Sequence, residues 1–101
     1  MKLVILTVVD EFEKQIIELL KEAGIENYSE SQIDGYKNST SVLESSNWFS
    51  GEIGGVKSRM FFSFNTSDKI DKLCERVEEF NQNLETNNPV RLVVVPIEKF
   101  I

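Results

Sequence analysis

Few side chains in this sequence could carry out chemistry. The chain has no histidine, and its one cysteine is Cys74. Imidazole is the usual general base beside a serine or cysteine nucleophile and a frequent zinc ligand, so sites of those kinds are excluded. Carboxylates, hydroxyls and a few cations remain, which leaves carboxylate or metal-assisted hydrolysis as the chemistry still open to an enzyme. We predict no catalytic residue and no metal ligand. The acidic residues near Cys74 are expected to form a solvated helix face, and Cys74 itself to behave as a buried small hydrophobe.

The most distinctive local feature is the only tryptophan, Trp48, beside Phe49 in a serine- and glycine-rich stretch. Residues 38–55 lack a strand or helix pattern, and a connection of that length in a small domain is usually functional or disordered. Aromatic side chains on an exposed loop are frequent anchors in protein interfaces. Trp48 and Phe49, with the neighbouring Glu52 and Ile53, are therefore predicted to bind a partner. The alternative is that Trp48 packs against its own or a neighbouring subunit.

The overall charge restricts the class of partner. Seventeen acidic residues against 11 basic residues give a formal charge of −6. Such a chain is repelled by phosphate backbones and anionic lipid surfaces, so nucleic-acid binding is not expected. Residues 3–9 are apolar but are followed at once by Asp10 and Glu11, which favours a buried strand over a signal peptide. With no apolar run of about 20 residues, membrane insertion is not expected either, and the chain is predicted to be cytoplasmic.

The apolar periodicity predicts six elements in one domain covering 1–101. Strands are expected at 3–9, 26–37, 57–65 and 91–97, with the polar second one at a sheet edge and the last one ended by Pro96. Helices are expected from Asp10 to Ala23 and from Ser67 to Leu84. The order β-α-β-β-α-β predicts an α+β fold: a ferredoxin-like four-stranded antiparallel sheet with both helices on one face and a long loop between strands 2 and 3.

Helix ends are predicted from their capping residues. Asp10 followed by Glu13 has the spacing of a capping box, and Gly24 follows the last apolar position of the first helix. Ser67 precedes the apolar stripe of the second helix and is expected to cap it.

The first and last strands are apolar on both faces. Leu3 and Ile5 alternate with Val4 and Leu6, and residues 92–97 repeat the pattern. Two helices cover only one face of such a sheet, which leaves an apolar face larger than monomers usually expose. We therefore predict a homo-oligomer formed through the open face of the sheet. The alternative is a monomer whose long loop folds back over that face.

Three stretches give the chain a resemblance to a known family. Gly35-Tyr36-Lys37 is similar to the glycine–aromatic–glycine step that launches the T-loop of P-II signal-transduction proteins. The length of residues 38–55 is similar to that loop, and Val94-Val95-Pro96-Ile97-Glu98 is similar to the closing V-x-P-I/V-E stretch. Over nearly the whole chain, the sequence resembles a divergent branch of this family found beside heavy-metal efflux transporters.

The resemblance implies a homotrimeric, non-enzymatic regulator that docks its loop onto a partner, here a membrane transporter of the metal-efflux type. It also implies a small-ligand cleft between subunits, lined by Gly35, Tyr36, Lys37 and Arg91. Lys37 and Arg91 would hold an anionic or nucleotide ligand there; ordinary surface cations are the alternative.

The chain departs from the family pattern in ways that bear on this ligand. The connector 84–91 has no glycine and a single cation, whereas nucleotide-binding members hold phosphates with a glycine- and cation-rich loop at that place. Lys37 also replaces the second glycine of the T-loop step. These departures weigh against adenine-nucleotide binding of the usual kind, and no cofactor is predicted with certainty. The rival hypothesis is a small ferredoxin-like hydrolase that uses carboxylates or a metal.

Overall fold

The computed structural model describes residues 1–36, 56–84 and 88–101. In chain order the elements are β1 (Lys2–Val9), the 3-10 turn η1 (Asp10–Phe12), α1 (Glu13–Glu22), β2 (Ser29–Gly35), β3 (Val56–Asn65), α3 (Ser67–Gln82) and β4 (Arg91–Pro96). This order confirms the predicted β-α-β-β-α-β pattern and the α+β, ferredoxin-like class.

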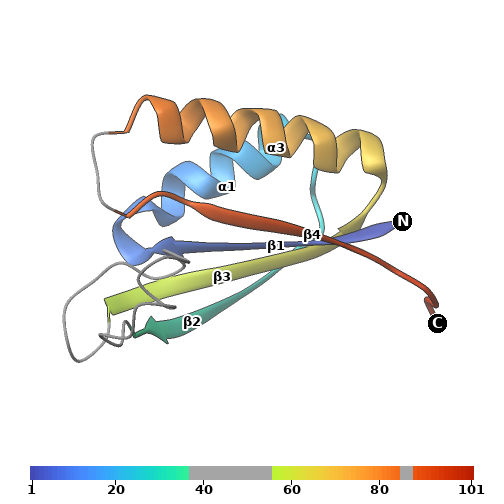
Figure 1. The fold of residues 1–101 in the computed structure, drawn as a ribbon, viewed down its shortest axis with the longest axis horizontal. Helices are drawn as coiled ribbons and strands as arrows, with labels where there is room; N and C mark the ends of the chain where they lie inside the picture. Colours follow the sequence, from blue (N-terminus) through green and yellow to red (C-terminus); the bar gives the residue numbers. More distant parts are fainter. Residues whose placement is uncertain (37–55, 85–87) are drawn as a thin grey trace, which may run out of the picture.

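The four strands form one antiparallel sheet in the order β2-β3-β1-β4, and both helices lie on the same face of it (Figure 1). The most apolar strand, β1, lies inside the sheet, where β3 and β4 pair with it on either side. The polar strand β2 lies at one edge, as predicted, and β4 forms the other. Pro96 is the last residue of the edge strand β4, a position where a residue without an N–H is tolerated.

The core lies between the helices and the facing side of the sheet. Val4, Leu6 and Val8 of β1 are at most 3% exposed, as is Phe61 of β3. The helices supply the remaining buried side chains, chiefly Ile16, Leu20, Ile70, Leu73 and Val77. The three- and four-residue spacing of these positions aligns them on one side of each helix, and their burial drives the docking of the helix layer.

The predicted capping box is wrong. Asp10 opens the turn η1, Phe12 occupies the N-cap position of α1, and neither helix start has a side-chain cap. Instead, the Asp10 carboxylate accepts a hydrogen bond from Arg59 Nε at 2.6 Å. A charge-assisted bond to a guanidinium is stronger than a cap to a neutral backbone amide, which explains why the side chain turns away from the helix.

The other helix ends differ from prediction only locally. Thr66, not Ser67, is the N-cap residue of α3, and the helix ends at Gln82, two residues before Leu84. Gly24 does terminate α1: its φ is +79°, a conformation that favours glycine. The Gly24 N–H donates to the Lys21 carbonyl, and the Ile25 N–H to the Leu20 carbonyl. This pair of bonds is the Schellman motif, which satisfies two carbonyls at the end of the helix.

Candidate functional site at the loop end of the sheet

The residues predicted to bind a ligand or a partner belong to one end of the sheet. There β2 ends, and β3 and β4 begin (Figure 1). Gly35, the last residue of β2, is buried, and Tyr36 directly after it is 58% exposed. Lys37 and the loop residues Trp48, Phe49, Glu52 and Ile53 lie outside the described residues.

Arg91 and Gly35 are at the same end of the sheet but on opposite edges. Arg91 begins β4 and pairs with Thr7, whereas Gly35 pairs with Val56 on β3. Two strands, β3 and β1, lie between them, so strand spacing alone separates the two backbones by about 14 Å. A single chain therefore does not bring these two predicted cleft residues together.

The start of β4 is held in place by Asn81 of α3. The Asn81 side-chain amide donates to the Val90 carbonyl, and its oxygen accepts from the Val90 N–H, both at 2.9 Å. The Asn81 amide thus bonds both backbone groups of Val90, as a residue of a neighbouring strand would. This fixes the backbone directly before Arg91. A cavity of about 320 Å³ lies between α3 and β4 and is lined by Cys74, Val77, Glu78, Asn81, Val90, Arg91 and Leu92.

Cys74 lines that cavity as a partly buried side chain packed against the core. Burial raises the pKa of its thiol, and the nearby carboxylates of Asp71 and Glu78 add to the shift. A raised pKa favours the protonated thiol, which is a poor nucleophile and a poor metal ligand. The environment agrees with the predicted role as a small hydrophobe.

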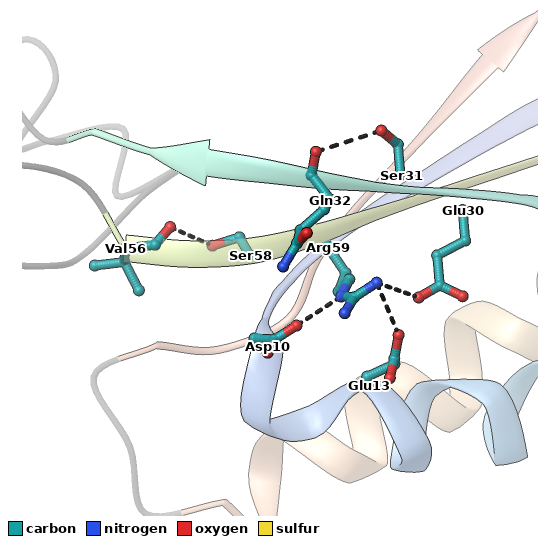
Figure 2. A network of polar contacts seen from close by, with 8 residues as sticks. All are labelled: Asp10, Glu13, Glu30, Ser31, Gln32, Val56, Ser58 and Arg59. Atoms are coloured by element: carbon teal, nitrogen blue, oxygen red, sulfur yellow. Dashed lines mark hydrogen bonds and ion pairs between the residues drawn. The ribbon is translucent and has the colours of Figure 1, made fainter.

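The structure also shows a polar cluster that the sequence prediction missed. Arg59 on β3 reaches across the helix-facing side of the sheet to Asp10, Glu13 and Glu30 (Figure 2). Its Nε lies 2.6 Å from Asp10 Oδ1, and its Nη1 lies 3.2 Å from Glu13 Oε2 and 3.2 Å from Glu30 Oε1. A signal was present: Arg59 is two residues from Phe61 and so shares its helix-facing side, where an arginine requires carboxylate partners.

The cluster raises the pKa values of Arg59 and Glu30, but for different reasons. The hydrogen bond that Arg59 donates to Asp10 raises the pKa of Arg59, and the three carboxylates together stabilise its charge. The Glu13 carboxyl, which can share a proton with Glu30, raises the pKa of Glu30, and desolvation and repulsion from Glu13 act in the same direction. The attraction of Arg59 opposes this rise. Three carboxylates thus share one guanidinium, and Glu13 and Glu30 compete for the same nitrogen.

The face of the sheet opposite the helices is apolar. Strand pairing aligns Leu3 with Phe64 and Val95, and Ile5 with Phe62 and Val93. Phe64 is 45% exposed and Val95 40% exposed. The rings of Phe62, Phe64 and Phe100 form an edge-to-face row with centroid separations of 6.3 and 5.5 Å. The predicted second apolar face is therefore present and uncovered by either described helix.

The described residues show neither a metal site nor a membrane-spanning helix. In residues 1–36, 56–84 and 88–101, no group of three or more acidic, cysteine or histidine side chains is arranged to hold a metal ion. Over the same ranges, neither helix combines the length and the apolar character needed to cross a bilayer.

Comparison with known proteins gives a likeness in structure. No protein-family model matches the chain, and no curated protein matches its sequence. Among solved structures it is similar to CPII from Thiomonas intermedia K12, described as a nitrogen regulatory PII-like protein bound to ADP, AMP and bicarbonate. The TM-score is 0.62 at 15% identity, and the match covers 99% of this chain and 94% of that one. From end to end, the chain therefore has the fold of a PII-like protein.

Proposed function

We propose that this chain is a non-enzymatic, cytoplasmic regulator of the P-II-like family, a homotrimer that binds a protein partner through its long loop. The observation that carries the proposal is the shared fold with CPII over 99% of this chain. It is supported by the place of residues 37–55, which connect β2 to β3 at the end of the sheet where Arg91 also lies.

The apolar face that neither α1 nor α3 covers supports the trimer. Leu3, Ile5, Phe62, Phe64 and Val95 would remain in contact with water in a single chain, at a cost of roughly 25 cal/mol for each Å² of apolar surface. A second and a third copy would each cover part of this face and present the same face in return.

The loop is the proposed partner-binding element. Trp48 and Phe49 would fill a pocket of the partner, with Glu52 and Ile53 beside them. The partner proposed from the sequence resemblance is a membrane transporter of the heavy-metal efflux type. Trp48→Ala should abolish binding to a purified pump of this type and leave the trimer intact, whereas Ser50→Ala, a small change in the same loop, should leave both unchanged.

A small anionic ligand at the subunit cleft is the proposed control. Gly35, Tyr36 and Lys37 of one chain and Arg91 of the next would line this cleft, because a single chain keeps Gly35 and Arg91 on opposite edges of the sheet. The CPII structure is described as bound to ADP, AMP and bicarbonate, which makes these three the probes to use. Since the connector 84–91 lacks glycine and has one cation, bicarbonate or another small anion is the ligand that this site favours.

Native mass spectrometry of the gently purified protein tests the proposal. A mass of three chains of 11.6 kDa is expected, with added mass when ADP, AMP or bicarbonate is supplied. A trimer that takes up none of the three would contradict ligand control and leave a purely protein-binding loop. A monomer would contradict the assembly and favour a loop folded over the sheet. Turnover of ADP, lost on changing one acidic residue, would favour the hydrolase instead.

A further inference from the structure

The edge strand β2 has an unusual attachment to the rest of the protein. Five of its seven residues are exposed, and among the described strands it pairs only with β3. Glu30, Gln32 and Asp34 alternate on its helix-facing side, so β2 offers no apolar side chain to the helix layer. A strand with one ladder and little buried surface belongs to the part of a fold that opens most readily.

The cluster of Asp10, Glu13, Glu30 and Arg59 connects β2 to the helix layer, to which β2 offers no apolar side chain. Glu30 is on β2, Arg59 is on β3, Glu13 is in the first turn of α1, and Asp10 is in η1 (Figure 2). Their side chains are between 24% and 43% exposed, so solvent weakens the ion pairs without removing them. Through Arg59, which contacts Glu30 on one side and Asp10 and Glu13 on the other, the edge strand is connected to the start of the helix layer.

The charges of the cluster make this connection depend on a proton. The groups that face Glu30 are Glu13 from α1, Asp10 from η1 and Arg59 from β3. When one proton is present, Glu13 and Glu30 can hydrogen-bond to each other while Arg59 binds both. When both are ionised, two like charges lie beside a single guanidinium nitrogen and repel each other.

We propose that Asp10, Glu13, Glu30 and Arg59 form a proton-sensitive latch that holds the edge strand β2 against the start of α1. Because β2 leads through Tyr36 to residues 37–55, the latch would also set how firmly the strand that precedes the loop is held. The latch is a property of the fold alone; its effect on the partner rests on the proposed function.

The direction of the pH effect follows from Glu30. Its pKa in the folded protein is raised above the ordinary value of 4.5. The stabilising effect of its proton is therefore complete below the unfolded pKa and is lost as pH rises through the higher folded pKa. The contribution of the Glu30 proton to the latch is thus complete in acid and is lost as Glu30 ionises.

Amide hydrogen exchange of the whole protein, labelled at several values between about pH 4 and pH 8, tests the latch. Rates for residues 29–35 are corrected for intrinsic exchange and divided by those of β1 in the same sample. In the wild type, this ratio should rise with pH through the titration of Glu30. Glu30→Gln keeps a hydrogen-bonding side chain without its charge, and it should give a low ratio with no pH dependence.

Arg59→Met removes the centre of the latch and should speed exchange of residues 29–35 about two- to fivefold, the effect of a partly exposed ion pair or two. Arg59→Lys keeps the charge and should give an intermediate exchange rate, and it replaces the Met variant in the test if that variant fails to fold. Glu75→Gln, an exposed carboxylate on α3, is the matched control and should behave as the wild type. Equal pH profiles for Glu30→Gln and the wild type would overturn the proposal, as would acceleration spread evenly over all four strands.

The regulatory consequence has a separate readout. Binding of the purified transporter should change with pH in the wild type and lose that dependence in Glu30→Gln. If exchange follows the prediction but binding does not, the link between latch and loop is overturned. If no variant binds the transporter while exchange still follows the prediction, it is the proposed function that fails.

Discussion

The two faces of the sheet are similar in sequence but differ in what covers them. On β1, Val4 and Leu6 are completely buried under the helices, whereas Leu3 and Ile5 on the other face are only partly buried. The residue types are nearly the same, so composition does not distinguish the faces. The difference arises because the two helices of the described residues, α1 and α3, both pack on one side. An apolar face that neither of these helices covers is a candidate surface for association.

The strand β3 repeats the contrast in adjacent residues. Phe61 is completely buried and contacts the ring of Tyr28 at a centroid distance of 5.9 Å, whereas Phe64 on the other face is 45% exposed. Phe62 shares the face of Phe64 and is partly buried. Neighbouring phenylalanines on one strand thus belong to two different environments, which makes them a matched set for substitution.

The largest effect is expected from Phe61→Ala. Removing a fully buried aromatic ring loses its transfer free energy and leaves a cavity. The free energy of unfolding should therefore fall by about 3–5 kcal/mol. Urea denaturation, followed by circular dichroism at fixed protein concentration, measures this change. Phe62→Ala is the control on the open face and should cost less than half as much under dissociating, dilute conditions. Equal losses for the two variants would contradict the difference between the faces.

The second effect concerns assembly. Phe64→Glu places a charge in the aromatic row of the open face, where burial against another copy would desolvate it at a cost of several kcal/mol. The mass measured by light scattering should fall from three chains to one while the circular dichroism spectrum is retained. Glu75→Gln on α3 should leave the mass unchanged. A Phe64→Glu protein of unchanged mass would show that the open face is not the interface.

A smaller effect is expected on the covered face, where Asn81 holds the start of β4. Asn81→Ala leaves the N–H and the carbonyl of buried Val90 without these partners, which should cost about 1–3 kcal/mol in the free energy of unfolding. Asn83→Ala is the matched control, because its side chain makes one exposed bond to the Glu79 carbonyl. The control should change stability by no more than about 0.5 kcal/mol. Denaturation of both variants gives the comparison, and similar values for the two would refute the role of Asn81.

The smallest effect is expected at Gly24. A Cβ there would meet only Lys69 side-chain carbons, the nearest at 3.8 Å, so space is sufficient. The cost of Gly24→Ala is therefore the left-handed backbone conformation alone, about 1 kcal/mol. A thermal melt at the same concentration as the wild type should show a drop of a few degrees. A loss as large as that of Phe61→Ala would mean that packing, and not the backbone angle, governs this position.

Much of the fold could be predicted because periodic apolar residues act locally. The apolar run of residues 3–9 and the helical spacing of Ile70, Leu73 and Val77 are sufficient to predict their elements, and the polar residues of β2 are sufficient to predict its edge position. The helix start at Asp10 was mispredicted because the capping pattern considers only near neighbours. The group that the Asp10 carboxylate contacts instead, Arg59, is 49 residues away in sequence.

The candidate site could be predicted only in part. The positions of Gly35 and Arg91 at one end of the sheet follow from the element order, because β2 ends where β4 begins. Their separation across two intervening strands required the strand order β2-β3-β1-β4, which residue spacing does not give. The assignments of Lys37, Trp48, Phe49, Glu52 and Ile53 remain predictions.

By itself, the sequence determined the elements, the apolar character of both sheet faces and the exclusion of histidine chemistry, since these depend on residue types and local spacing. The tertiary structure alone decided which face the helices cover, which carboxylates meet at Arg59 and how far Gly35 lies from Arg91. Those outcomes depend on contacts between residues distant in the chain, and such contacts are set by how the packed layers bring the strands and helices together.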